Sequence, residues 1–194
     1  METDDAGFAN LVDRHKDSLI NYLRHLTRSQ ERAEEIAQDA FVRLYRNLAS
    51  VRDSSIAPYL FRIATNLAVS QMRREKRWRL LLPKFQATHR ESETADRRLV
   101  TNEIQSKVTA ALERLPVKLR APLVLFEIEE WPYHEIAGAL GCRIGTVKSR
   151  IFRARALMRK ELESWWIGGT DERQRDWKCD APAAARDSVA SIHV

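Results

Sequence analysis

Seven lysines and arginines crowd into residues 141–160, GCRIGTVKSRIFRARALMRK, without one acidic residue among them. Such side chains form charge-assisted hydrogen bonds with phosphates and with the edges of nucleic-acid bases. The same stretch also carries enough aliphatic residues to fold as a helix with one buried side. The alternative is a solvated basic face on a core helix, as basic runs in general often are. The two interpretations differ in what the exposed face presents.

The helical positions of these residues separate them into two faces. At about 100° per residue, four residues form a narrow apolar seam: Val147, Ile151, Ala154 and Met158. Four others fall on the face opposite that seam: Lys148, Ser149, Phe152 and Arg153. Lysine and arginine can donate hydrogen bonds to phosphates or to guanine edges, and serine can bond to phosphates or to base edges. Phenylalanine can make an apolar contact with a thymine methyl group. This face therefore predicts binding in a DNA major groove.

The residues before this helix have the spacing of a helix-turn-helix. A short helix is predicted over 133–140, followed by the turn Gly141-Cys142-Arg143. Ala137 lets two helices approach closely, Gly141 takes the turn without a Cβ penalty, and Val147 is the buried aliphatic residue. This context favours a DNA-reading helix over a solvated one.

The elements that carry these residues are all predicted to be helices. Apolar residues recur at helical spacing over 8–26 and 33–48, with a helix N-cap offered by Thr27-Arg28-Ser29. Residues 49–57 form a polar loop, and Pro58 suits the first turn of a third helix. These three helices predict a small bundle with one shared core.

After the predicted linker, apolar residues again recur at helical spacing in the second half of the chain. Helical spacing returns over 104–115, and Pro116 stops it. The next helix runs to about Glu129, with Pro122 expected to bend it or delay its start. We therefore predict an all-α chain of two small helical domains joined by a flexible linker. The predicted units are a three- or four-helix bundle over 1–78, a linker over 79–103, the helix-turn-helix domain over 104–167 and a disordered tail over 168–194.

The composition of the chain excludes several classes of protein. The net charge is +6 over 194 residues, and Cys142 and Cys179 lie too far apart for a CxxC motif. No apolar run approaches the roughly 20 residues that cross a bilayer, and the acidic N-terminus is unlike a signal peptide. There is no P-loop and no HExxH motif, and the five histidines are scattered. We predict a cytoplasmic protein that is not an enzyme, with no metal, no cofactor and no membrane insertion.

Three stretches of the chain resemble a known family. LERLPVKLRAPLVLFEIEEWPYHEIAGALGCRIGTVKSRIFRARALMRKEL resembles region 4 of the extracytoplasmic-function (ECF) sigma factors. ERAEEIAQDAFVRLYRNL and PYLFRIATNLAVSQMRREKR resemble region 2 of the same family. Strings like GTVKSR occur in other helix-turn-helix regulators, but the two halves together, in this order, are specific.

The resemblance implies two sets of DNA-binding residues. The set for the −35 promoter element is Lys148, Ser149, Phe152 and Arg153, with Arg150 and Arg155 near the phosphates. The set for the −10 element is Tyr59, Asn66 and Ser70, with Arg73, Arg74, Lys76 and Arg77 on backbone phosphates. Tyr59 stands where tryptophan is commoner, and the loop 49–57 matches the one that receives a flipped base. The alternative for the last four residues is that they complement the helix dipole.

The resemblance also implies protein partners. Glu35, Gln38 and Asp39, beside Phe41, match the surface that docks on the β′ clamp helices of core RNA polymerase, although solvated helix charges would look the same. Region 4 would contact the β flap. Trp131-Pro132 replaces the family's more usual small capping pair, so partner contacts nearby are expected to differ. An anti-sigma factor is a further candidate partner, with the linker and tail as contact sites.

The implied function is a sigma factor that directs core polymerase to promoters, recognises the −35 and −10 elements, and helps to melt the latter. Two alternatives remain open at this point. One is a helix-turn-helix regulator that acts without being a polymerase subunit. The other is an interaction adaptor built on an inactivated sigma fold, which the departure at Tyr59 would suit.

Overall fold

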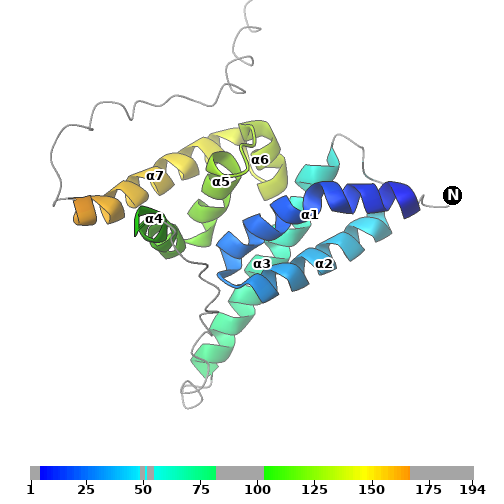
Figure 1. The fold of residues 1–194 in the computed structure, drawn as a ribbon, viewed down its shortest axis with the longest axis horizontal. Coiled ribbons are helices and arrows are strands. Elements are labelled where there is room, and N and C mark those ends of the chain that lie inside the picture. Colours follow the sequence, from blue (N-terminus) through cyan, green and yellow to red (C-terminus); the bar gives the residue numbers. More distant parts are fainter. Residues whose placement is uncertain (1–4, 49–50, 52–54, 82–102, 167–194) are drawn as a thin grey trace, which may run out of the picture.

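The computed structural model describes residues 5–48, 51, 55–81 and 103–166, and these residues form seven α-helices and no strand (Figure 1). The helices are α1 (Asp5–Thr27), α2 (Gln30–Asn47), α3 (Ile56–Leu81), α4 (Glu103–Arg114), α5 (Val117–Glu127), α6 (Tyr133–Leu140) and α7 (Ile144–Trp166). The all-α prediction is therefore confirmed. The predicted tail, most of the predicted linker and most of the loop 49–57 lie outside the described residues, whereas residues 79–81 belong to α3 and residue 103 begins α4.

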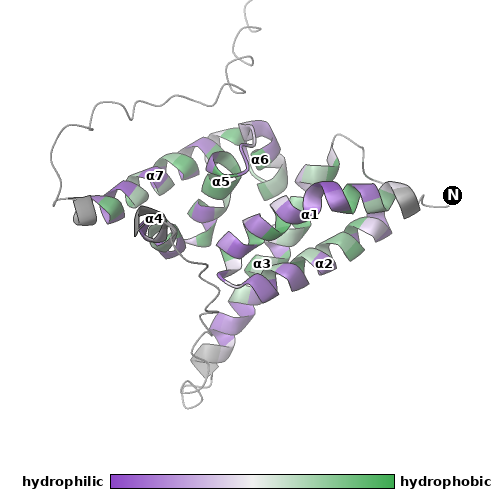
Figure 2. Cartoon of the chain, in the orientation of Figure 1, coloured by the Kyte–Doolittle hydropathy of each residue, from purple (hydrophilic) through white to green (hydrophobic). Residues whose placement is uncertain are grey.

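Helices α1 to α3 form an N-terminal bundle. The connection between α1 and α2 contains the predicted helix N-cap. α1 ends at Thr27, Arg28 adopts a positive φ of 63°, and Ser29 caps α2. The Ser29 hydroxyl accepts a hydrogen bond from the Arg32 backbone N–H at 3.3 Å, which satisfies one of the free donors of the helix start. The apolar stripes of the three helices face one another, and polar residues lie outside (Figure 2).

α3 begins two residues before Pro58, which therefore lies in the first turn as predicted. The helix then continues to Leu81, beyond residue 78, where the sequence suggests that the bundle ends. Its last turns are made of arginine, lysine, leucine and glutamate, which are good helix formers. The basic segment that follows Gln71 is therefore helical.

Helices α4 to α7 form a C-terminal bundle. Pro122 lies inside α5 and does not delay the start of this helix, which begins at Val117 directly after Pro116. A proline at this position removes one backbone hydrogen bond. The residues from Arg120 to Phe126 are all buried, so packing of the helix compensates for the missing bond. The turn between α6 and α7 falls at Gly141, as predicted.

The two bundles pack directly against each other, which the sequence pattern did not predict. α3 lies against α6, and α1 lies against α5 (Figure 1). The buried apolar residues of both bundles form one contiguous core. The aromatic rings of Phe61 in α3 and Trp131, just before α6, meet with centroids 4.5 Å apart. The positions of α3 and α7 are therefore fixed relative to each other in this structure.

Candidate nucleic-acid interface

α7 has one buried side and one open side, as its periodicity predicts. The seam is closed: Val147 and Ala154 are 0% exposed and Ile151 is 2% exposed. Met158 is partly buried against the same core. The opposite side presents Phe152 at 75% exposure. An aromatic side chain this exposed contributes little to the core, and its ring is free to contact the methyl group of a thymine.

The residues around Phe152 form a basic, polar surface. Lys148, Ser149 and Arg153 are all exposed. The Ser149 hydroxyl donates to the Thr146 carbonyl at 3.0 Å, and the Lys148 ammonium lies 5.7 Å from the centre of the Tyr133 ring. The structure thus brings together the four residues predicted for this face. We call Lys148, Ser149, Phe152 and Arg153 the α7 face.

The other two arginines assigned to this site lie apart from the α7 face. Arg155 pairs with Glu127 of α5 at 2.6 Å, and its guanidinium stands 5.3 Å from the centre of the Phe126 ring. Arg150 is half-buried, with Nη1 3.8 Å from the Cys142 sulfur. Both arginines therefore brace α7 against its neighbours, and a phosphate would have to compete with these contacts.

The turn between α6 and α7 sets the direction of α7, and therefore the orientation of the α7 face. Gly141 has φ 59° and ψ 41°, a left-handed conformation that glycine adopts without a Cβ clash. The Cys142 N–H donates to the Ala137 carbonyl at 3.0 Å, which closes the end of α6. Ala137 and Val147 are buried, as the helix-turn-helix spacing predicts.

α3 carries the second set of predicted residues along one face. Spacings of seven, four, three and four residues place five side chains on the same side of the helix: Tyr59, Asn66, Ser70, Arg73 and Arg77. All but Tyr59, which is half-buried, are exposed, and the exposed Arg74 and Lys76 flank the row. We call these seven residues the α3 face.

A single acid interrupts this basic segment, and it is turned away. Glu75 pairs with Arg32 of α2 at 3.1 Å. Its charge is therefore partly neutralised within the bundle, which leaves the positive potential of the α3 face largely uncompensated.

Two residues that the sequence interpretation did not select belong near this site. Arg62 is exposed and lies between Tyr59 and Asn66 on the α3 face side of the helix. Trp78 follows Arg77 and is 56% exposed. The i, i+3 and i+4 spacing from Asn66 could have found Arg62, and an aromatic residue within a basic run is a signal that could have found Trp78.

Of the four α2 residues assigned to polymerase binding, three are exposed and one is buried. Glu35, Gln38 and Asp39 are exposed. Phe41 is 8% exposed and packs in the core of the N-terminal bundle, so it supports this edge from beneath. The exposed apolar groups beside the edge are instead Val42 and Tyr45, at 50% and 41%.

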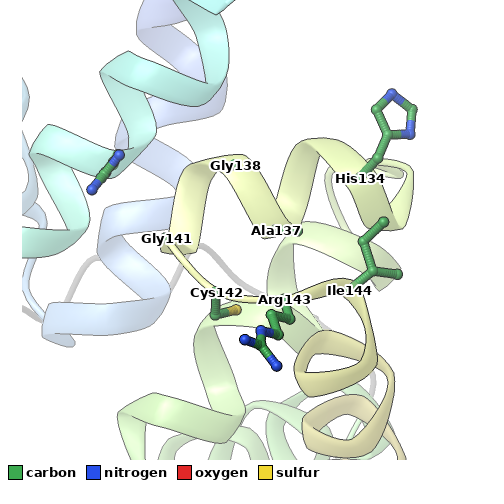
Figure 3. Close-up of a pocket in the computed structure, with 8 residues that line it drawn as sticks. His134, Ala137, Gly138, Gly141, Cys142, Arg143 and Ile144 are labelled. Carbon is green, nitrogen blue, oxygen red and sulfur yellow. The ribbon is translucent and has the colours of Figure 1, made fainter.

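A shallow, open depression lies between α3 and the turn of the helix-turn-helix (Figure 3). Figure 3 shows Cys142 and Arg143 directly after Gly141, with Ile144 and His134 on the side away from α3. Arg62 and Arg143 give it a basic lining, with no carboxylate among the lining residues. The described residues contain no group of three or more side chains that could hold a metal ion, and no described helix is long and apolar enough to cross a membrane.

Comparison with known proteins identifies the family. The model of Sigma-70 region 2 matches residues 11–78, and that of Sigma-70 region 4 matches residues 105–158. The chain belongs to the ECF RNA polymerase sigma factors of the sigma-70 family. The N-terminal bundle therefore contains region 2 and the C-terminal bundle region 4. The family is not enzymatic, which agrees with the prediction that the chain is not an enzyme.

Curated relatives cover most of this sigma factor. It is 32% identical to the sigma-H factor of Pseudomonas aeruginosa over 170 residues, which are 82% of this chain and 88% of that protein. It is 31% identical to SigW of Bacillus subtilis over 169 residues, 82% of this chain and 90% of that one. SigE of Mycolicibacterium smegmatis is 33% identical over 154 residues, 78% of this chain but only 60% of that longer protein.

Solved structures share the fold of this sigma factor. RpoE of Bartonella quintana, solved in complex with the anti-sigma factor NepR, superposes with a TM-score of 0.66 at 25% identity, over 81% of this chain and 97% of that one. CnrH, solved with the cytosolic domain of CnrY, gives 0.60 at 24% identity, over 84% and 91%. The recognition of the family from sequence is confirmed, whereas the assignments of single residues stay predictions.

Proposed function

We propose that this sigma factor reads the −35 element with the α7 face and the −10 element with the α3 face, and that it carries core polymerase to promoters with both elements. The observation that carries this proposal is that α7 has one buried apolar side and one exposed basic side. Ile151 is 2% exposed and its neighbour Phe152 is 75% exposed, on a helix that follows a left-handed glycine turn. Such a helix can enter a major groove without disturbing the core behind it.

The chemistry of the α7 face supports direct reading of bases. Arg153 can donate two hydrogen bonds to a guanine edge, and Phe152 can contact a thymine methyl group. In this proposal Arg150 and Arg155 position α7 and reach phosphates only after their present contacts with Cys142 and Glu127 are exchanged.

The chemistry of the α3 face supports the capture of a melted strand. Asn66 offers both a donor and an acceptor to an unpaired base edge, and Tyr59 contributes an aromatic ring. Arg73, Arg74, Lys76 and Arg77 would hold phosphates. Trp78 extends the site, because an exposed indole can stack on an unpaired base.

The partners follow from the remaining surfaces. Glu35, Gln38 and Asp39 would meet the basic β′ clamp helices, with Val42 and Tyr45 as the apolar part of that surface, and the C-terminal bundle would contact the β flap. The two functional domains are then the N-terminal bundle, predicted over 1–78 and extended by α3 to Leu81, and the C-terminal bundle, predicted over 104–167 and begun by α4 at Glu103. Both would act in the cytoplasm. The complex of RpoE with the anti-sigma factor NepR supports the expectation of such a partner here.

Transcription in vitro with purified core polymerase and a promoter library tests this function. The proposal predicts stimulated initiation at a defined subset of promoters. A regulator that works without polymerase would bind DNA alone and leave initiation by core polymerase unchanged, and an adaptor would bind neither DNA nor polymerase productively. Folded protein that never stimulates initiation would refute the proposal.

The residue-level test compares two arginines of α7. Arg153→Ala should relax the −35 preference at a cost of about 1–3 kcal/mol for the preferred sequence. Arg159→Ala is the matched control, because Arg159 is also exposed but lies farther from the turn. It should weaken all sequences about equally. A uniform loss in Arg153→Ala would mean that Arg153 contacts only phosphate.

A further inference from the structure

Two aromatic rings and two cations form a continuous line of contacts between α5, α6 and α7, which pack against one another (Figure 1). The Phe126 and Tyr133 rings are stacked, with centroids 4.8 Å apart and an interplanar angle of 7°. The Lys148 ammonium lies 5.7 Å from the centre of the Tyr133 ring. The Arg155 guanidinium lies 5.3 Å from the centre of the Phe126 ring. Each of these cations of α7 therefore contacts one member of a stacked ring pair.

The ring pair is held in place by the helices that carry it. Phe126 is 3% exposed in α5, so its ring cannot move without opening the core. Tyr133 is the first residue of α6 and follows Pro132, whose pyrrolidine ring restricts the backbone and whose φ is −70°. The Pro132 carbonyl accepts hydrogen bonds from the N–H groups of Glu135 and Ile136, each at 3.1 Å. Tyr133 is half-buried, and it therefore presents a fixed ring to α7.

Lys148 differs from Arg155 in the kind of partner that it has. The Arg155 guanidinium pairs with the Glu127 carboxylate at 2.6 Å, which occupies its N–H groups. Lys148 forms no ion pair within the described parts of the chain, and its contact is with the uncharged Tyr133 ring. The face of an aromatic ring attracts a cation electrostatically and takes no lone pair into the contact. The three N–H donors of Lys148 therefore stay available to a ligand.

A lysine that is held in this way is better prepared to bind one group than a freely rotating lysine. Immobilising a long side chain is one of the costs of binding, and a side chain that is already restrained loses less freedom. A cation–π contact at an exposed site changes an equilibrium constant by about two- to fivefold. Because the ammonium is restricted relative to α7, it would meet one base edge of a bound duplex. A guanine edge suits it best, since O6 and N7 both accept hydrogen bonds in the major groove.

We infer that Tyr133 is a positioning residue for −35 recognition and that it directs Lys148 to a guanine edge. This inference rests on the proposed function of the α7 face. Tyr133 acts only through Lys148, whereas Phe152 and Arg153 of the same face recognise DNA without the ring. One position of the promoter preference is therefore determined from α6, outside the helix that enters the groove.

Binding of promoter duplexes by the complex of core polymerase with this sigma factor tests the inference. Each −35 base pair is replaced in turn, and discrimination is the ratio of the Kd values for the replaced and the preferred pair. Lys148→Ala identifies the pair that Lys148 recognises, as the position of its largest loss. Tyr133→Leu should reduce discrimination at that position by about two- to fivefold and leave it unchanged at the others. No loss, or an equal loss at every position, would overturn the inference.

Double substitution separates positioning from a general weakening of the complex. Residues that act through each other give non-additive effects, whereas independent residues give additive ones. At the position that Lys148 recognises, Tyr133→Leu should therefore add nothing to Lys148→Ala. At the position where Arg153→Ala has its largest effect, Tyr133→Leu should change nothing with or without Arg153→Ala. A further loss when Tyr133→Leu is added to Lys148→Ala would mean that Tyr133 does not act through Lys148.

Two other substitutions in α6 are matched controls. Tyr133→Phe keeps the aromatic ring and its stacking on Phe126, and it should retain the discrimination of the parent. His134→Ala changes an exposed neighbour on the same helix and should also retain it. If Tyr133→Phe loses as much discrimination as Tyr133→Leu, the effect belongs to the phenol hydroxyl, and the inference is wrong.

An NMR measurement on the free protein keeps the test valid where Tyr133→Leu loosens α6. The ring current of Tyr133 should shift the ε-methylene protons of Lys148 upfield in the parent and in Tyr133→Phe, but not in Tyr133→Leu. Unshifted protons in the parent would overturn the inference. If the parent complex discriminates at no −35 position, the proposed function fails, while the shift still decides whether Tyr133 holds Lys148.

Discussion

α3 and α7 present similar binding chemistry in different surroundings. Both are long helices with one side in a core and a basic, partly aromatic opposite side. The α7 face is open, with Phe152 at 75% exposure. On α3, Tyr59 is half-buried, and Arg62 beside it lies against the turn at Gly141. In this structure, therefore, the α7 face is open to solvent, while the Tyr59 end of the α3 face lies close to the C-terminal bundle.

The largest expected effect comes from substitutions made separately on the buried and the exposed sides of α7. Ile151→Ala removes a residue that is 2% exposed and should lower the free energy of unfolding by about 2–5 kcal/mol. Phe152→Ala should change it by less than about 0.5 kcal/mol while weakening promoter binding. Urea denaturation and binding measurements on the two variants give the comparison. A large stability loss in Phe152→Ala would mean that its ring packs on something in solution.

The sequence predicted α7 better than it predicted α3, and the reason is physical. The α7 seam, the turn glycine and the exposed face are all local, because helix periodicity and backbone conformation are properties of neighbouring residues. The contact of Arg62 with Gly141 and the tilted ring contact of Trp131 with Phe61 join residues far apart in the chain. No periodic pattern encodes such pairs, so the packing of the two bundles and the contacts of Arg62 and Glu129 between them appear only in the structure.

A second test concerns the exposed end of α3. Trp78→Ala should weaken binding to a promoter whose −10 strands are held apart by mismatches by about 1–3 kcal/mol, because one stacking partner of an unpaired base is lost. Trp78→Phe is the matched control, since it keeps an aromatic face and should retain most of the affinity. Equal losses in the two variants would show that the indole N–H, not stacking, makes the contact.

A third test addresses the turn at Gly141, which joins α6 to α7 and lies against Arg62 of α3. Gly141→Ala places a Cβ at φ 59° and should cost about 1–2 kcal/mol of folding free energy. Gly145→Ala is the control within the same motif, because it lies in α7 with open space around it. That variant should be neutral or slightly more stable. Thermal unfolding measures both, and equal effects would contradict the left-handed turn.

The smallest expected effect is a pH dependence at the junction of the bundles. Burial first, then Arg24 and Arg120, lowers the pKa of His25 below its usual 6.5. The unfolded chain therefore binds a proton more readily than the folded one, so the stability that neutral His25 contributes is complete above pH 6.5 and is lost as the pH falls through that value. Burial and Arg14 lower the pKa of His15 in the same direction. Urea denaturation at pH 7.5 and pH 5.5 should show a smaller loss in His25→Gln than in the parent, and smaller still with His15→Gln added. Identical losses in all three proteins would mean that neither imidazole is held neutral by the fold, and that the positive charge of Arg120 does not reach His25.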